Sequence, residues 1–196
     1  SGDSIAVYPA WNLSPSQTAK LIDYSTRLAL ALKTKGLINI QYVISGGQIY
    51  VIEVNPRSSR TVPYLSKVTG IPMIDIATKV MLGEKLKDMP YGTGLYPSAS
   101  YTAIKVPVFS FEKLSGLDTT LGPEMKSTGE VLGIAPTMTE ALYKGLLGAG
   151  YSLTKEGGGF VTVRDTDKEE IPEIAERFYK LGFHLYVTEG TANVLR

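Results

Sequence analysis

The chain has 196 residues, of which 43% are hydrophobic and 20% are charged, and its 20 Lys and Arg nearly balance 19 Asp and Glu to give a net charge of +1. Such a composition is typical of an ordinary globular protein and excludes a global attraction to nucleic acid or to a membrane surface. We therefore expect neither as a partner, and a charged ligand needs a local site. The length allows one domain or two small ones.

Cysteine and histidine are almost absent, which removes several kinds of chemistry. The sequence has no cysteine and one histidine, His184. Disulfides, thiolate metal sites and a catalytic thiol are excluded, and one histidine leaves little room for a Ser/His mechanism or a multi-histidine metal site. We interpret His184 as a structural strand residue. Since no apolar run is long enough to span a membrane and the first residues lack the features of a signal peptide, we expect a cytoplasmic protein.

Three helices are predicted in the first half of the chain from apolar residues that recur every three to four positions. The first helix has a serine N-cap, Ser14, and Pro15 in its first turn, and Gly36 is expected to end it. The other two are short and are separated by Gly70. The predicted bounds are about 15–34, 61–69 and 72–82.

A hairpin of two strands, 37–44 and 49–54, is predicted between the first and second helices. Two registers compete, because a one-residue slip moves every side chain to the other face. A two-residue loop would pair Ile40 with Glu53, whereas a three-residue loop pairs Gln41 with Glu53. We favour the three-residue loop, because it pairs apolar residues with apolar residues and polar residues with polar ones.

Residues 84–136 are rich in proline and glycine. We expect an irregular connecting segment there, with only short strand-like pieces such as 101–108. A helix is then predicted to begin at Thr137, since Thr137 and Glu140 form the pattern of a capping box.

The C-terminal part of the chain predicts a βαβ unit, in which two parallel strands are joined by a helix. Its predicted elements are a strand at 160–163, a helix at 168–181 and a strand at 183–187. A further helix is expected to begin at about Thr191.

The polar face of the predicted hairpin offers oxygen ligands from Gln41, Glu53 and Asn55. Mg²⁺ and Mn²⁺ prefer such ligands and usually share them with substrate phosphates, which makes ATP the natural partner. Arg57 and Arg60 follow and can hold phosphate or developing negative charge. The same residues also fit a hairpin with a solvated polar face, and from spacing alone both interpretations stay open.

The string Tyr50–Arg57, preceded by Gln41, resembles the metal-binding end of ATP-grasp ligases, which form acyl phosphates from carboxylates and ATP. The resemblance implies an α+β ATP-grasp C-terminal lobe, made of an antiparallel sheet with helices. It implies that Gln41, Glu53 and Asn55 bind Mg²⁺ or Mn²⁺, and that Gln41 and Glu53 also contact ATP. It gives Arg57 a catalytic contact with phosphate or substrate.

Three further strings, Ser1–Ser4, Asn55–Pro63 and Leu121–Val131, look like those of the carbamoyl-phosphate synthetase large-subunit family. The resemblance is to the second half, which phosphorylates carbamate. It implies an ATP-dependent ligase that makes carbamoyl phosphate from bicarbonate and glutamine-derived ammonia, for pyrimidine or arginine biosynthesis. It also implies a small glutamine amidotransferase subunit as partner, an oligomer of large subunits, and an ATP contact at Ser1.

Lys168 stands at the start of a predicted helix, and Thr188 and Thr191 flank the start of the next. The residues alone favour helix caps and a solvated lysine. The family resemblance implies a partial α/β methylglyoxal-synthase-like regulatory domain, in which these three residues hold the phosphate of UMP, IMP or phosphoribosyl pyrophosphate. Val106 stands where ornithine-activated members carry an acidic residue, although Asp3 matches another ornithine contact. We therefore expect a pyrimidine-dedicated enzyme controlled by UMP and phosphoribosyl pyrophosphate.

These expectations divide the chain into the C-terminal part of an ATP-grasp domain (1–83), a connecting segment (84–147) and the N-terminal part of the regulatory domain (148–196). We expect the isolated segment to be inactive. Two alternatives remain. One is another ATP-grasp ligase, such as a biotin-dependent carboxylase, and the other is a stand-alone nucleotide-binding regulatory module.

Overall fold

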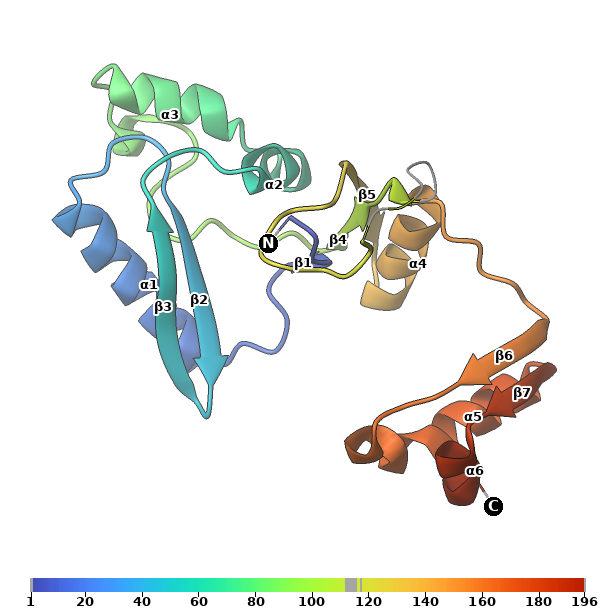
Figure 1. Ribbon diagram of the computed structural model, residues 1–196. Helices are drawn as coiled ribbons and strands as arrows, with labels where there is room; N and C mark the ends of the chain where they lie inside the picture. Colours follow the sequence, from blue (N-terminus) through green and yellow to red (C-terminus); the bar gives the residue numbers. More distant parts are fainter. Residues whose placement is uncertain (1, 112–115, 117, 196) are drawn as a thin grey trace. The chain divides into compact units, whose positions relative to one another are not determined.

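The computed structural model describes residues 2–111, 116 and 118–195, and the chain divides into two compact units, Ser1–Tyr151 and Ser152–Arg196 (Figure 1). The first unit contains β1 (Ala6–Tyr8), α1 (Pro15–Ala31), β2 (Asn39–Ser45), β3 (Gln48–Asn55), α2 (Thr61–Thr69), α3 (Met73–Met81), the 3₁₀ turn η1 (Leu86–Asp88), β4 (Thr102–Val108), β5 (Gly129–Ala135) and α4 (Met138–Gly148). The second contains β6 (Gly157–Val161), the 3₁₀ helix η3 (Asp165–Glu170), α5 (Ile171–Lys180), β7 (Phe183–Val187) and α6 (Glu189–Leu195).

Helix α1 begins as predicted and ends three residues early. A complete capping box closes its start, since the Gln17 N–H donates to Ser14 Oγ at 3.2 Å and the Ser14 N–H donates to Gln17 Oε1 at 2.9 Å. At its other end Lys33 takes the left-handed conformation, with φ 50°, and the Thr34 N–H reaches back to the Ala29 carbonyl. The prediction that Gly36 ends the helix is therefore wrong, because the chain already reverses at Lys33.

Helices α2 and α3 match their predicted bounds to within one residue, and Gly70 ends α2 in the left-handed conformation. Helix α4 begins as predicted, with Thr137 as its N-cap and its side chain accepting from the Glu140 N–H. The three helices therefore follow from local sequence, since caps and apolar spacing act within one or two turns.

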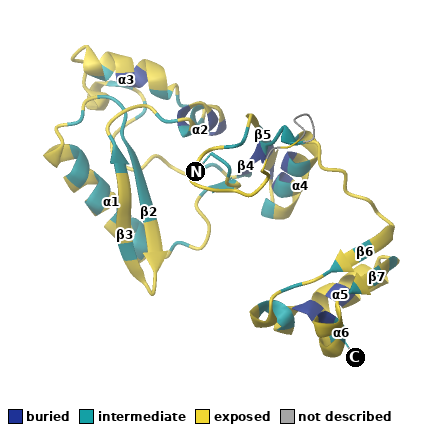
Figure 2. Cartoon of the chain, viewed as in Figure 1, coloured by how far each residue is buried: buried dark blue, intermediate teal, exposed yellow. Residues whose placement is uncertain are grey.

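The core of the first unit is a three-stranded antiparallel sheet in the order β1-β4-β5. Helix α4 packs on one face, around Ile104 and Val106 of β4. Helix α2 packs on the other, where Tyr64 and Val68 meet Ala103. The buried residues of this core accordingly lie on α2, β4 and α4, and α3 contributes further buried residues, Ile76 and Ala77 (Figure 2).

The expectation of an irregular segment over 84–136 is wrong for its last part. Residues Gly129–Ala135 form strand β5, which pairs with β4 along its whole length. Two glycines made this strand look like a turn in the sequence. In the fold, one of them, Gly133, lets α4 approach the sheet closely.

Tyr64 should make the stability of this core depend on pH. Its buried hydroxyl donates to the Ala103 carbonyl at 3.0 Å. Burial, with smaller contributions from the charge of Glu130 and from Tyr8, raises the pKa of Tyr64 to about 12. Since the folded pKa exceeds the unfolded value of 10.0, Tyr64 supports folding fully below that pH. We expect this contribution to the free energy of unfolding to fall as the pH rises from there towards the folded pKa.

Denaturant titrations over that alkaline range should show a decline for the wild type that is shallower in Tyr64→Phe. At neutral pH the same variant should lose about 1 kcal/mol with its hydrogen bond. Tyr143, which is 47% exposed, is the matched control. Equal alkaline slopes for wild type and Tyr64→Phe would contradict the prediction.

The second unit has the predicted βαβ arrangement. Strands β6 and β7 are parallel and α5 connects them, with Ile171 and Ala175 buried. Strand β6 begins three residues before its predicted start, η3 precedes α5 where one continuous helix was expected, and α6 begins at Glu189. His184 lies exposed on β7, so the prediction of a strand residue is confirmed. Over the described ranges, no helix is both long and apolar enough to cross a membrane.

Candidate functional site

The turn of the β2–β3 hairpin contains two residues, so the predicted three-residue loop is wrong. Ser45 pairs with Gln48, which leaves Gly46 and Gly47 as the loop. Both glycines have positive φ, 55° and 76°. A two-residue hairpin turn of this kind needs positive φ at both positions, and two consecutive glycines supply it without strain.

The predicted polar pairing is nevertheless confirmed, because a β-bulge changes the register along the hairpin. Near the turn the strands pair as a two-residue loop dictates, as far as Tyr42 with Val51. The register then shifts, and Gln41 pairs with Glu53. Ile52 has no cross-strand partner and takes up the extra residue, which is what a bulge does.

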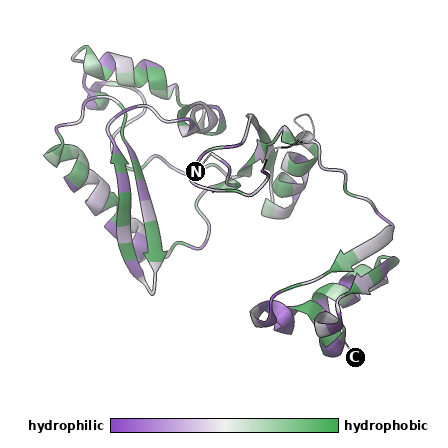
Figure 3. Ribbon diagram, in the orientation of Figure 1, coloured by the Kyte–Doolittle hydropathy of each residue, from purple (hydrophilic) through white to green (hydrophobic). Residues whose placement is uncertain are grey.

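The two faces of the hairpin differ in character. Tyr42 lies on the face that meets α1, where its hydroxyl hydrogen-bonds the Ser25 hydroxyl at 2.7 Å. Polar and apolar residues are interspersed along both strands (Figure 3), with adjacent apolar residues at Val43–Ile44 and Val51–Ile52. The cross-strand pair Gln41 and Glu53 lies on the other face, because Gln41 is next to Tyr42 on β2 and successive side chains of a strand point to opposite faces.

Gln41, Glu53 and Asn55 converge on one another. The Gln41 Nε2 donates to Glu53 Oε2 at 3.3 Å, and the Asn55 Nδ2 donates to Glu53 Oε1 at 2.5 Å. Glu53 is exposed and the two amides are half-buried, so a ligand can reach the carboxylate. A half-turn of each amide would present its oxygen in place of its nitrogen.

This donor set fits a hard divalent cation, since it can offer one carboxylate and two amide oxygens. The described part of the chain, the hairpin included, contains no group of three His, Cys, Asp or Glu residues that could hold a metal ion. With a single carboxylate, an ion on the hairpin would need further oxygen ligands from phosphate or water.

Two arginines follow the hairpin. Arg57 is exposed, and its Nη1 donates to the Ser58 carbonyl at 2.8 Å. Arg60 stands at the N-terminus of α2, and its Nη1 donates to Met125 Sδ at 2.7 Å. Both guanidiniums have further N–H groups that could donate hydrogen bonds to an anion. Ser1, the expected ATP contact, lies outside the described residues.

Lys105 is a buried charge that the sequence did not reveal. It is 4% exposed on β4, and its Nζ donates to the Gly2 carbonyl at 3.1 Å. A lysine in an alternating strand looks solvent-facing in the sequence, and only the packing of the first residues against β4 buries it. The neighbouring Val106 is also buried and packs against α4, so its side chain faces the core rather than a ligand.

In the second unit the structure brings Lys168, Thr188 and Thr191 together. The hydroxyls of Thr188 and Thr191 are 3.1 Å apart, and a Cβ built on Gly190 would lie 3.0 Å from Lys168 Nζ. Lys168 also pairs with Asp165 at 2.6 Å, and this ammonium lowers the pKa of the carboxyl.

Sequence reasoning missed Thr162, whose hydroxyl lies 3.4 Å from that of Thr188. Thr162 follows β6 and Thr188 follows β7. These strands are parallel neighbours, and the residues after them meet at the same edge of the sheet, where ligands of such sheets bind. That rule could have identified Thr162.

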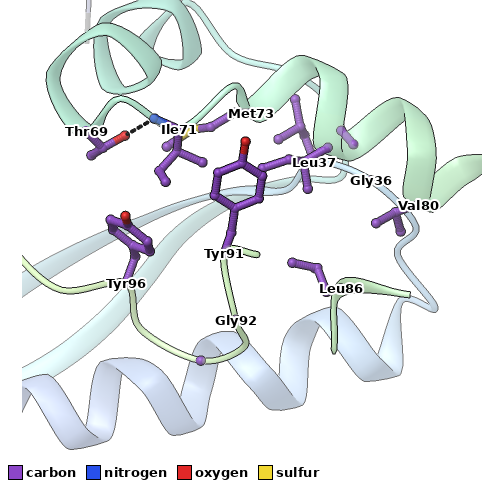
Figure 4. Close-up of a pocket in the computed structure, with 13 residues that line it drawn as sticks. Gly36, Leu37, Thr69, Ile71, Met73, Val80, Leu86, Tyr91, Gly92 and Tyr96 are labelled. Carbon is purple, nitrogen blue, oxygen red and sulfur yellow. Dashed lines mark hydrogen bonds between the residues drawn. The ribbon is translucent and has the colours of Figure 1, made fainter. Parts of the chain in front are cut away.

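A pocket of about 220 Å³ lies elsewhere in the first unit, with Tyr91 and Tyr96 among its lining residues (Figure 4). Its described lining contains no Asp, Glu, Lys, Arg or His. The titratable groups of the described lining are Tyr91 and Tyr96, which offer no carboxylate to a metal and no cation to a phosphate, so we assign the chemistry to the hairpin.

Residues 1–89 match the family described as carbamoyl-phosphate synthase L chain, ATP binding domain. The matched residues include the whole β2–β3 hairpin, with Gln41, Glu53 and Asn55. Over its full 196 residues the chain is 57% identical to the carbamoyl phosphate synthase large chain of Lachnoclostridium phytofermentans. It is 56% identical to that of Agathobacter rectalis. The chain spans 18% of the length of either large chain, so it is similar to one segment of the synthase.

Among solved structures, the biotin carboxylase domain of a single-chain bacterial carboxylase aligns with 54% of this chain and 25% of its own. The identity is 21% and the TM-score 0.48, which is too low to bear on function. The match to synthase large chains extends over the second unit as well as the first.

Proposed function

We propose that this chain is a segment of a carbamoyl phosphate synthase large chain, from the half that phosphorylates carbamate, and that its β2–β3 hairpin binds the phosphate end of ATP with Mg²⁺ or Mn²⁺. The observation that carries the proposal is the convergence of Gln41 and Asn55 on Glu53, within a region that matches the ATP-binding family. Replacing Glu53 in the complete large chain is the experiment that tests it.

In this proposal each residue has a role that its position supports. Glu53 contributes the carboxylate ligand, and Gln41 and Asn55 contribute amide oxygens after rotating away from it. A bound divalent ion would shield the phosphate charges of ATP. Arg57, exposed just after β3, holds the transferred phosphoryl group or the substrate.

The complete enzyme would use ATP, bicarbonate and ammonia released from glutamine by a small amidotransferase subunit, and would supply pyrimidine or arginine biosynthesis. The large chains would assemble into oligomers. The identity of 57% over all 196 residues favours this synthase over a biotin-dependent carboxylase. A stand-alone regulatory module with an inactive ligase lobe would be indifferent to the loss of Glu53.

We further propose that the second unit is part of a methylglyoxal-synthase-like regulatory domain that binds the phosphate of UMP, IMP or phosphoribosyl pyrophosphate. The clustering of Lys168, Thr188 and Thr191 supports it, since an ammonium and two hydroxyls can hold a phosphate together. Within this proposal the domains are residues 1–83, 84–147 and 148–196.

Ornithine activation is not expected. Val106 is 1% exposed and faces α4, and Asp3 uses both carboxylate oxygens to accept backbone N–H groups, from Lys126 and Ser127. These contacts, the Lys126 N–H foremost, lower the pKa of Asp3. Neither position therefore offers a free carboxylate to a diamine.

Lys168→Ala in the complete large chain should weaken UMP binding by about tenfold or more, because a charge-assisted hydrogen bond to phosphate is lost. Calorimetric titration measures the change. Lys180→Ala is the matched control, since Lys180 pairs with Glu176 on the surface of α5 just as Lys168 pairs with Asp165. UMP binding that is equally tight in both variants would contradict the regulatory proposal.

A further inference from the structure

The string Leu121–Val131 offers no group to the chemistry proposed above. In the structure its central residues, Met125, Lys126 and Ser127, contact two segments that are neighbours in sequence of residues assigned to the proposed site. One segment is Gly2–Asp3, which follows Ser1, and the other is Arg60, three residues beyond Arg57.

Asp3 is bound to this loop by two backbone hydrogen bonds. Its Oδ2 accepts from the Lys126 N–H at 2.9 Å and its Oδ1 from the Ser127 N–H at 2.8 Å. The adjacent Gly2 carbonyl accepts from Lys105 Nζ at 3.1 Å and from the Ser127 hydroxyl at 3.4 Å. Each carboxylate oxygen thus has its own donor, which fixes both the position and the orientation of the segment.

Met125 connects the same segment to Arg60. Its Sδ accepts from Arg60 Nη1 at 2.7 Å. A Cβ built on Gly2 would lie 2.0 Å from that sulfur, so a larger residue here would force the Met125 side chain to move. One side chain therefore packs on Gly2 and holds a guanidinium.

The loop itself is held on both sides. The Lys126 Nζ donates to the Thr120 carbonyl at 2.6 Å and to the Asp118 carbonyl at 2.8 Å. The Thr128 N–H donates to the Val108 carbonyl at 2.8 Å, where β4 ends. Since β4 is the central strand of the core sheet, the loop is anchored to the most buried part of the first unit.

We propose that Met125, Lys126 and Ser127 are positioning residues for the phosphate end of the ATP site. They act through Gly2–Asp3 and the Arg60 guanidinium and do not touch substrate themselves. The inference rests on the proposed function, because it needs ATP on the hairpin side of these segments. It gives the Leu121–Val131 string a task, which is to hold Gly2–Asp3 and Arg60 in the orientation that binds phosphate.

The test uses the complete large chain with its small subunit and measures ATP formation from carbamoyl phosphate and MgADP, the reverse of carbamate phosphorylation. Asp3→Asn leaves one acceptor oxygen for two N–H groups, and Met125→Ala removes the contact with Gly2 and Arg60. We expect each variant to raise the KM for MgADP about tenfold and to leave the thermal unfolding midpoint nearly unchanged. Met125→Leu, which restores the apolar contact with Gly2 but supplies no acceptor for Arg60, should recover only part of the Met125→Ala loss.

Asp23→Asn is the matched control, since Asp23 only pairs with Arg27 on the exposed surface of α1. An unchanged KM in Asp3→Asn and in Met125→Ala, with activity still lost in Glu53→Gln, would overturn the positioning role and keep the proposed function. A Met125→Leu protein that unfolds at a lower temperature but keeps the wild-type KM for MgADP would also overturn it, because Met125 would then act on stability alone. Full activity in Glu53→Gln would instead show that the proposed function is wrong.

Discussion

Replacing Glu53 by glutamine in the complete large chain is expected to lower carbamoyl phosphate formation by at least about a hundredfold. Glutamine keeps the shape of the side chain and removes the single carboxylate on which Gln41 and Asn55 converge. Changes to groups that only orient metal ligands cost about 10- to 100-fold, so the loss of the ligand charge should cost more. The rate should be measured over a range of Mg²⁺ and Mn²⁺ concentrations, since a lost ligand weakens metal binding.

A second reaction of the same protein supplies the internal control. Bicarbonate-dependent ATP hydrolysis belongs to the other half of the proposed enzyme, so it should persist in Glu53→Gln while ATP formation from carbamoyl phosphate and ADP disappears. Asp75→Asn controls for the loss of an exposed carboxylate, because Asp75 only pairs with Lys79 on α3. Undiminished carbamoyl phosphate formation in Glu53→Gln would show that the hairpin is not the metal site.

Replacing Gly133 by alanine should destabilise the first unit by about 3 kcal/mol or more. A Cβ at this position would lie 2.0 Å from the Ala141 carbonyl oxygen and 2.6 Å from the Gly145 nitrogen. Both atoms belong to the backbone of α4, which cannot yield as a flexible side chain can. Relief requires the helix to move off the sheet, and the contacts of Ile104 and Val106 with α4 would then be lost.

Urea unfolding followed by far-UV circular dichroism measures this loss. Gly122→Ala is the control, since a Cβ there would meet no atom within 4 Å, and its free energy of unfolding should change by less than about 0.5 kcal/mol. A Gly133→Ala protein as stable as the control would mean that α4 and β5 are not packed backbone to backbone.

The hairpin illustrates how far the sequence reaches towards the site. Matching polar with polar residues correctly predicted that Gln41 faces Glu53, and the structure confirms the pair. It predicted the wrong turn, because it assumed a single register along both strands. The two glycines of the turn require one register and the polar pair requires the other, and the bulge at Ile52 satisfies both. Such a compromise depends on the geometry of both strands together.

The buried contacts around β4 were beyond sequence reasoning for a related reason. Lys105 and Asp3 look like ordinary surface charges, and Met125 like part of a turn. Their contacts join residues about one hundred or more positions apart, such as Asp3 with Lys126 and Lys105 with Gly2. No local pattern encodes such distances, because they exist only after the first residues pair with β4 through β1.

The sequence by itself determined the elements whose causes are local. These are the capped starts of α1 and α4, the break between α2 and α3 at Gly70, the two strands of the hairpin and the βαβ unit, since each depends mainly on local sequence. The strings that resemble the synthetase family were also legible without coordinates. The tertiary structure alone decided that Gly129–Ala135 is a strand, that Lys105 is buried and that the Leu121–Val131 string holds Gly2, Asp3 and Arg60. Those outcomes depend on which surfaces pack together, and packing joins residues that are remote in the sequence.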